Sequence, residues 1–370
     1  MPEIEDRDGA KLLQEILAEF DRRKDQYDDL GAGTKGLIET ILKQEKIGIH
    51  SVQARVKSRK KLESKYCKSD KDYRCLDDMP DVVGFRIITY YSDELDVIAE
   101  IIGREFSELR PREDKRIGSP DTFGYSAIHF DCGYLQGRLS GTEYKRFSDA
   151  RFEIQVTTIL GHAWAEMHHP WYDESDSPTE EVRRFHRLAA VLELAEQEFL
   201  EIRKKKDSRQ RSASVRVAAK APGTPVTPES LIAFIEESEF VKQTDSKVAE
   251  VIGAQTSTRP NGRVLKIMAD FLTAIGIDTI QQVEDNLRDR GEAAVEFLVR
   301  RRAGTPPKPG AKRVDGISIF QVASFIAMLK GADAYAAIAS KANIAPQKAE
   351  VLQRQVAIAQ EIAKSLSPQG

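Results

Sequence analysis

Charged side chains that could bind a polyphosphate and its metal ion lie in two neighbouring segments of the chain. In RVKSRKKLESK, Arg55 and Lys57 stand near the end of an expected strand. Lys61 and Lys65 follow, four residues apart on one face of an expected helix. This cluster suits a polyphosphate, although a solvated run of charge has the same composition. In DMPDVVGFR, Asp81 stands at the mouth of an apolar strand, where it could bind Mg²⁺ or form a turn after proline.

Two later segments could form the other half of a site. In FGYSAIH, Tyr125 and His129 share a strand face, so a ring and an imidazole could receive a base and a phosphate. In RFEIQVT, Glu153 and Gln155 lie on the polar face of a strictly alternating strand. His162 follows in HAWAEMHH, whose three histidines raise zinc as an alternative without a Cys or HExxH spacing to support it. Each segment alone is also compatible with an ordinary strand or helix.

The pattern around these residues predicts a layer of strands and helices. Strands rich in Val, Ile, Phe, Thr and Tyr are expected at residues 48–57, 81–91, 125–135 and 151–158. Helical spacing is found at 93–106, with Asp93 as the expected cap, and at 185–202. Two amphipathic helices, separated by a GAGT break, are expected before the first strand. This alternation indicates an α/β fold of roughly 150 residues.

The rest of the chain has a different pattern. Residues 206–228 are basic and then rich in Ser, Ala and Pro without an apolar period, so we expect a linker. Thr227, Pro228 and Glu229 predict a helix start, and the spacing beyond them predicts a separate all-α domain over 229–370. The expected organisation is thus N-terminal helices over 1–45, an α/β domain over 46–205, a linker and the helical domain.

Composition narrows the class of protein. Of 370 residues, 41% are hydrophobic, enough for more than one core. The 56 basic and 59 acidic residues give a net charge of −3, which argues against a general nucleic-acid coat protein. The three cysteines form no C-x-x-C pair. Without a signal-peptide region or an apolar run of about 18 residues, a cytoplasmic protein that contacts no membrane is expected.

In this order the segments resemble the synthetase domain of the RelA/SpoT alarmone family over about residues 47–175. The matching motifs are R-x-K-x-x-x-S-x-x-x-K, D-x-x-G-x-R, G-Y-x-S/A-x-H, E-I-Q and H-A-W-A-E-x-x-H. The resemblance implies a nucleotidyltransferase-like mixed sheet flanked by helices. It also implies a GTP pyrophosphokinase-like enzyme of the stringent response, which transfers the β,γ-pyrophosphate of ATP to the ribose 3′-hydroxyl of GDP or GTP to make (p)ppGpp.

The resemblance also implies a role for each candidate residue. The ATP side has five cations: Arg55, Lys57, Lys61, Lys65 and Arg86. The arginines would stack on the adenine and the lysines would hold the phosphates, with Lys61 standing where the family has serine. Asp81 and Glu153 would bind Mg²⁺, and Glu153 would take the proton of the attacking hydroxyl. The acceptor side has four residues: Tyr125, which would stack on the base, His129, which would contact the phosphates, Gln155 and His162.

Departures from the family pattern leave the acceptor open. Asp121 stands where many alarmone makers carry a phosphate-binding lysine, Thr157 replaces the arginine of E-I-Q-x-R-T, and HHP at 168–170 replaces a more acidic stretch. A second interpretation is therefore a toxic family member that pyrophosphorylates the 3′ end of tRNA, which the basic residues between 203 and 216 would suit. A third is a non-catalytic nucleotide-binding module.

Two further expectations concern regulation and turnover. The sequence has no His-Asp dipeptide and its first motif begins at residue 55, so we expect no hydrolase domain and synthesis only. The C-terminal helices are expected to bind an inhibitor such as an antitoxin or another regulatory partner, to sense a ligand, or to form a homo-oligomer. The sequence does not rank these alternatives.

Overall fold

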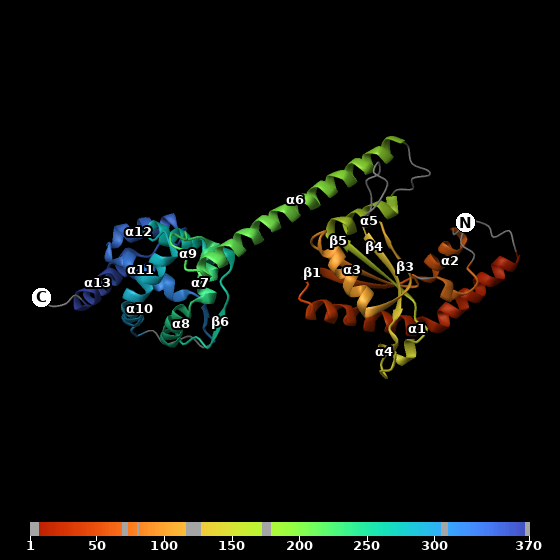
Figure 1. Ribbon diagram of the computed structural model, residues 1–370, viewed down its shortest axis with the longest axis horizontal. Helices are drawn as coiled ribbons and strands as arrows, with labels where there is room; N and C mark the ends of the chain where they lie inside the picture. The colour runs from red at the N-terminus through yellow and green to blue at the C-terminus, as the bar shows by residue number, and fades with distance from the viewer. Residues whose placement is uncertain are drawn as a thin grey trace. The chain divides into compact units, whose positions relative to one another are not determined.

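The computed structural model describes residues 7–68, 73–79, 81–115, 127–171, 179–304 and 310–366 (Figure 1). The chain forms two compact units, Met1–Arg203 and Lys204–Gly370. Among the described residues, no helix is both long enough and apolar enough to cross a bilayer.

A mixed five-stranded sheet organises the first unit. Its strands are β1 (Ile49–Val56), β2 (Val83–Thr89), β3 (Phe106–Asp114), β4 (Ala127–Tyr134) and β5 (Phe152–Thr158), in the order β1-β2-β5-β4-β3. Only the β2–β5 pairing is parallel. Four strands lie where the sequence predicts them, whereas β3 was not predicted. It is an edge strand whose residues after Phe106 are largely exposed, so it lacks an alternating apolar pattern.

Helices cover both faces of this sheet. The helical elements are α1 (Arg7–Gln44), α2 (Arg59–Lys68), η1 (Leu76–Asp78), α3 (Glu94–Glu105), α4 (Gln136–Leu139), η2 (Lys145–Phe147) and α5 (Ile159–Trp171). The buried residues of α1 and α3 share one core with Phe85, Phe130 and Ile154 of the sheet. Asp93 occupies the position before α3 but its side chain caps nothing there. The opposite face of the sheet carries the polar residues, and α5 lies over it.

The expectation of two N-terminal helices was wrong, because α1 is a single helix that runs through the GAGT segment. Gly31 and Gly33 each disfavour a helix by about 1 kcal/mol relative to alanine. Packing offsets this cost, since Leu30 and Ile38 are buried on either side of the segment. Thr34 is also buried, and its hydroxyl bonds the hydroxyl of Tyr134 on β4.

The prediction of a linker over residues 206–228 was wrong for its first half, because α6 (Thr179–Ala218) continues through residues 206–218. This stretch has no apolar period, but Lys, Arg, Gln and Ala are all good helix formers. The first proline after it is Pro222, and only residues 219–227 are non-helical before the next helix.

The second unit is helical, as predicted, with one short addition. Its elements are α7 (Pro228–Glu237), α8 (Glu239–Ile252), β6 (Thr256–Thr258), α9 (Gly262–Ala274), α10 (Ile280–Arg301), β7 (Lys312–Val314), α11 (Ile317–Leu329), α12 (Ala332–Lys341) and α13 (Ala349–Leu366). The predicted start of α7 is confirmed, since Thr227 Oγ1 accepts a hydrogen bond from Ser230 N. The unpredicted strands β6 and β7 form a parallel ladder of three residues each.

Candidate active site

Strand pairing arranges the candidate residues in two rows across the polar face of the sheet. One row contains Gln53, Arg86, Gln155 and His129, in register on β1, β2, β5 and β4. The next row contains Arg55, Gly84, Glu153 and Asp131. Residues two apart on a strand share a face, so both rows lie on the same side of the sheet. Gly84 leaves the second row open, because the nearest described atom to a Cβ added there is the Arg55 carbonyl oxygen, 4.0 Å away.

Two lysines hold Asp81, which precedes β2. Lys65 Nζ donates to Asp81 Oδ1 over 2.5 Å, and the buried Lys57 donates to the other carboxylate oxygen. Burial raises the pKa of Asp81, but the hydrogen bonds and charges of the lysines outweigh burial, and the pKa is lowered. Burial also lowers the pKa of Lys57, against the effect of Asp81. The result is an ionised carboxylate between two ammonium groups.

Glu153 is held by two neighbours on the same face. His129 Nδ1 lies 3.1 Å from Glu153 Oε1, and Gln155 Nε2 donates to Oε2 over 2.7 Å. Burial raises the pKa of Glu153, but the hydrogen bonds from His129 and Gln155 and the interaction with His129 outweigh burial and lower it. The charge of Asp81 acts in the opposite direction. Glu153 is therefore a second ionised carboxylate, close enough to Asp81 for their charges to interact.

Arg86 extends this network to α5. Its Nε donates to Gln155 Oε1 over 3.2 Å, and its Nη1 donates to Glu166 Oε1 over 2.7 Å. The same Nη1 lies 2.9 Å from His162 Nδ1. Burial lowers the pKa of His162 and the Arg86 charge lowers it further, so the neutral imidazole accepts this bond. Sequence reasoning did not assign Glu166 a role, although its position four residues after His162 places both on one helix face.

The structure thus gathers most of the predicted residues into two groups. Asp81, Lys57 and Lys65 form the first, and Glu153, His129, Gln155, Arg86 and His162 form the second. Arg55 and Lys61 are exposed, the first beside Gly84 on β1 and the second on α2. Tyr125 and Asp121 lie outside the described residues.

Asp81 and Glu153 fit the donor chemistry of a Mg²⁺ site. Both are ionised oxygen donors, and their charges interact. Mg²⁺ is usually held by one or two carboxylates together with waters and substrate phosphates. Within the described part of the chain, no group of three or more His, Cys, Asp or Glu side chains could hold a metal ion. The zinc alternative also involves His168 and His169, whose side chains are outside that part.

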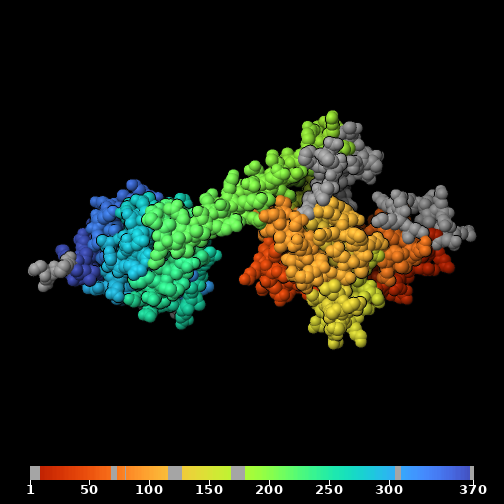
Figure 2. All heavy atoms as spheres, viewed as in Figure 1, coloured from red at the N-terminus to blue at the C-terminus, as the bar shows by residue number. Residues whose placement is uncertain are grey.

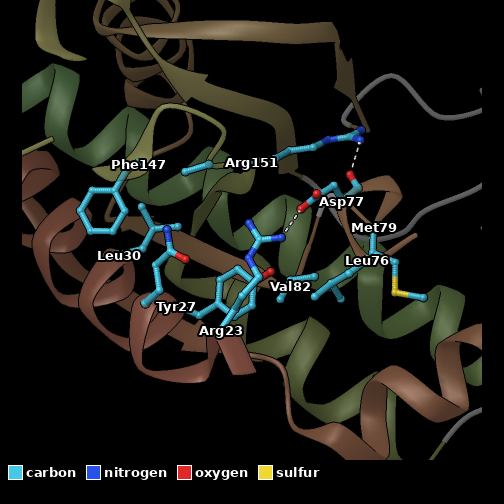
Figure 3. A pocket seen from close by; sticks show the side chains of 11 residues that line it. Arg23, Tyr27, Leu30, Leu76, Asp77, Met79, Val82, Phe147 and Arg151 are labelled. Atoms are coloured by element: carbon cyan, nitrogen blue, oxygen red, sulfur yellow. Dashed lines mark hydrogen bonds and ion pairs between the residues drawn. The ribbon is translucent and has the colours of Figure 1, made fainter. Parts of the chain in front are cut away.

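A small cavity lies where α1 meets the segment that leads to Asp81 (Figure 3). Its volume is about 20 Å³, room for about one water molecule, so it cannot hold a nucleotide. Arg23 Nη1 donates to Asp77 Oδ1 over 2.8 Å, and Arg151 Nη1 donates to the carbonyl oxygen of Asp77 over 3.1 Å. These contacts fasten η1 in place.

Residues 54–177 match a family described as the region found in RelA/SpoT proteins. The chain carries a RelA/SpoT domain. The resemblance seen in the sequence is thereby confirmed, and the RelA/SpoT domain makes the chain an enzyme of the pyrophosphotransferase class. No curated protein matches the chain in a sequence comparison.

Several solved structures are similar to about half of the chain. Small alarmone synthetase 1 from Bacillus subtilis is 22% identical, with 51% of this chain and 98% of that chain covered and a TM-score of 0.43. A GTP pyrophosphokinase family protein from Streptococcus pneumoniae is also 22% identical, with 51% and 95% covered and a TM-score of 0.42. The Bacillus subtilis synthetase bound to its product pppGpp is 23% identical, with 52% and 97% covered and a TM-score of 0.41. Likeness at this level carries no conclusion about the substrates of this chain.

Proposed function

We propose that the protein transfers the β,γ-pyrophosphate of ATP to the ribose 3′-hydroxyl of GDP or GTP, making (p)ppGpp. The observation that carries this proposal is the pairing of two unlike carboxylates. Asp81 is bound by two lysine ammonium groups, whereas Glu153 is oriented by His129 and Gln155. The first arrangement suits a polyphosphate and the second suits a proton acceptor.

On the donor side, Lys57 and Lys65 would move from Asp81 onto the phosphates of ATP. A flexible ammonium group can exchange one anionic partner for another at little cost in geometry. Arg55 would stack on the adenine from β1, and Lys61 would add charge at the edge. A Mg²⁺ ion held by Asp81 and Glu153 would neutralise the charge on the transferred group.

On the acceptor side, Glu153 would accept the proton of the 3′-hydroxyl. The 3′-oxygen then bonds to the β-phosphorus, the bond from that phosphorus to the bridging oxygen of the α-phosphate breaks, and AMP leaves. His129 holds the carboxylate in place, and Gln155 connects it to Arg86. Protein groups do little covalent work, so orientation and charge would supply most of the rate.

Transfer to the 3′ end of tRNA is the second candidate. The basic part of α6 favours it, since Lys205, Lys206, Arg209 and Arg211 are charged and mostly exposed. Arg203 contributes less, because it donates to Glu94 over 3.0 Å and lies 4.2 Å from the Tyr91 ring centroid.

Purified protein incubated with ATP labelled in the γ-phosphate separates these candidates. Label in a guanosine product supports the main proposal, label in added bulk tRNA supports the second candidate, and no transfer to either contradicts both. The Glu153→Gln variant is the control, because it keeps a hydrogen-bonding side chain and removes the proton acceptor. Labelled product incubated with the protein should stay intact if the chain only synthesises it.

Roles for the second unit remain predictions. A cavity of about 440 Å³ lies among α6, α7, α8 and α10, with Phe234, Phe240 and Ile280 in its lining beside Arg216 and Arg288. That volume is within the range of small-molecule sites. The cavity therefore supports ligand sensing as well as binding of an inhibitor or regulatory partner. Fragment binding measured on the whole chain would test the first alternative.

A further inference from the structure

Arg151, the residue before β5, connects two other elements of the RelA/SpoT domain, and Figure 3 shows its contact with one of them at Asp77. Its Nε donates to Asp131 Oδ1 over 2.8 Å, and its Nη2 donates to the other carboxylate oxygen. Its Nη1 donates to the main-chain oxygen of Asp77 over 3.1 Å. The side chain is 18% exposed, so the contacts are largely shielded from water. A planar guanidinium is suited to such a three-way contact, because its donors form a rigid fork.

Both elements that Arg151 joins are next to a carboxylate of the site. Asp131 on β4 is the register partner of Glu153 on β5. Asp77 belongs to η1, four residues before Asp81. The Arg151 side chain therefore links Asp131, which pairs with Glu153, to Asp77, which lies shortly before Asp81 in the chain.

The link is made by a permanent cation, because a guanidinium stays charged in proteins. Its bonds to both carboxylate oxygens of Asp131 fix the side chain while Nη1 reaches the main chain of Asp77.

We propose that Arg151 is a positioning residue that holds Asp81 at its working place relative to Glu153. The proposal rests on the proposed pyrophosphate transfer for its kinetic consequence. A lysine at position 151 would keep the charge and could pair with Asp131, but its single ammonium group cannot reproduce the fork that also reaches Asp77. The η1 segment would then be tied to α1 through Arg23 but no longer to the sheet through residue 151.

The test compares Arg151→Lys with Arg138→Lys in the whole chain. Arg138 is a matched control, because it lies in the same unit, is 25% exposed and donates to Glu105 Oε2 over 3.1 Å. Arg151→Lys should lower kcat about tenfold to a hundredfold, which is the effect expected when a catalytic group is displaced by about 1 Å. The KM for GTP should change little. Calorimetry with a non-hydrolysable ATP analogue and Mg²⁺ should show about tenfold weaker binding. Arg138→Lys should match the wild type in all of these measurements.

The outcomes separate this proposal from the function on which it rests. If the wild type transfers pyrophosphate and Arg151→Lys keeps both its kcat and its affinity for the analogue, Arg151 does not position Asp81. Equal losses in Arg151→Lys and Arg138→Lys, with equal falls in melting temperature, would show a general structural role and also overturn the proposal. If the wild type transfers nothing, the proposed function fails, and the calorimetric comparison alone decides whether Arg151 supports the ATP side.

Discussion

An enclosed aspartate is found in each unit, and the two are held in different ways. In the first unit, Asp81 is bound by the side chains of Lys57 and Lys65 and is 25% exposed. In the second unit, Asp245 of α8 is 2% exposed and accepts hydrogen bonds from main-chain nitrogens, Gly316 N over 2.6 Å and Ser318 N over 2.9 Å.

The difference separates a structural aspartate from one that is available to a ligand. Gly316 and Ser318 lie at the start of α11, so Asp245 satisfies amides that the helix itself leaves unpaired. Main-chain partners cannot leave, so Asp245 stays bound to the start of α11. The lysines of Asp81 are flexible side chains that can turn toward another anion. Burial raises the pKa of Asp245 despite its hydrogen bonds, whereas the lysines lower that of Asp81.

The largest expected effect is the loss of transfer in Asp81→Asn. Removing a main electrostatic stabiliser of a transition state usually costs about 10²–10³ in rate. The fold should survive, since the carboxylate is held only by exchangeable side chains. Transfer of label from ATP measures the rate, and Asp25→Asn on an exposed face of α1 is the control. A variant that keeps more than about a tenth of the wild-type rate would contradict the assignment.

In the second unit, Asp245→Ala should instead reduce stability. It leaves two buried amides without their acceptor, at about 1–3 kcal/mol each, so the free energy of unfolding should fall by about 2–6 kcal/mol. Both tryptophans, Trp164 and Trp171, belong to the first unit. In denaturant titrations, circular dichroism should therefore show an earlier transition while tryptophan fluorescence is unchanged. An equal shift in both signals would mean that the loss of Asp245 destabilises both units, which contradicts the prediction.

A smaller effect is expected at the glycine that Asp245 binds. Gly316 has a φ of +80°, and a Cβ added there would lie 2.4 Å from Ile235 Cδ1. Gly310 is a matched control, because its φ is +71° but no described atom lies within 4 Å of an added Cβ. Both alanine variants carry the backbone strain, and Gly316→Ala should lose about 1–3 kcal/mol more in chemical denaturation. Equal losses would show that Ile235 moves aside freely.

The smallest effect is a pair of opposite pH dependences. The lowered pKa of Asp81 means that its contribution to stability is present above about pH 4 and is lost as the pH falls through that pKa. The raised pKa of Asp245 has the opposite sign, so stability is lost as the pH rises from about 4 through that pKa. In thermal melts, Asp81→Asn should weaken the acid dependence seen by fluorescence. Asp245→Asn should weaken the decline of the melting temperature with rising pH that circular dichroism measures. If neither variant changes how its melting temperature depends on pH, both assignments are contradicted.

Much of the first unit could be predicted because strand alternation is local. Glu153 and Gln155 stand between buried residues on β5, so their shared face can be read from the sequence. The start of α7 is equally local, since Thr227 caps an amide three residues away. The predictions that failed depend on contacts between residues far apart in the chain. The GAGT segment of α1 stays helical because Thr34 reaches Tyr134, 100 residues away in the chain.

The candidate site depends on both scales. Sequence alone determined the residue types, the faces of the strands and, through the motifs, the family resemblance, because each depends on spacings of a few residues. Only the tertiary structure decided which side chains meet. Lys57 reaches Asp81 across 24 residues, Arg151 reaches Asp77 across 74, and Arg86 reaches Glu166 across 80. These contacts follow from strand order and helix placement, which are set by the burial of a core shared by many distant residues, and no local pattern encodes them.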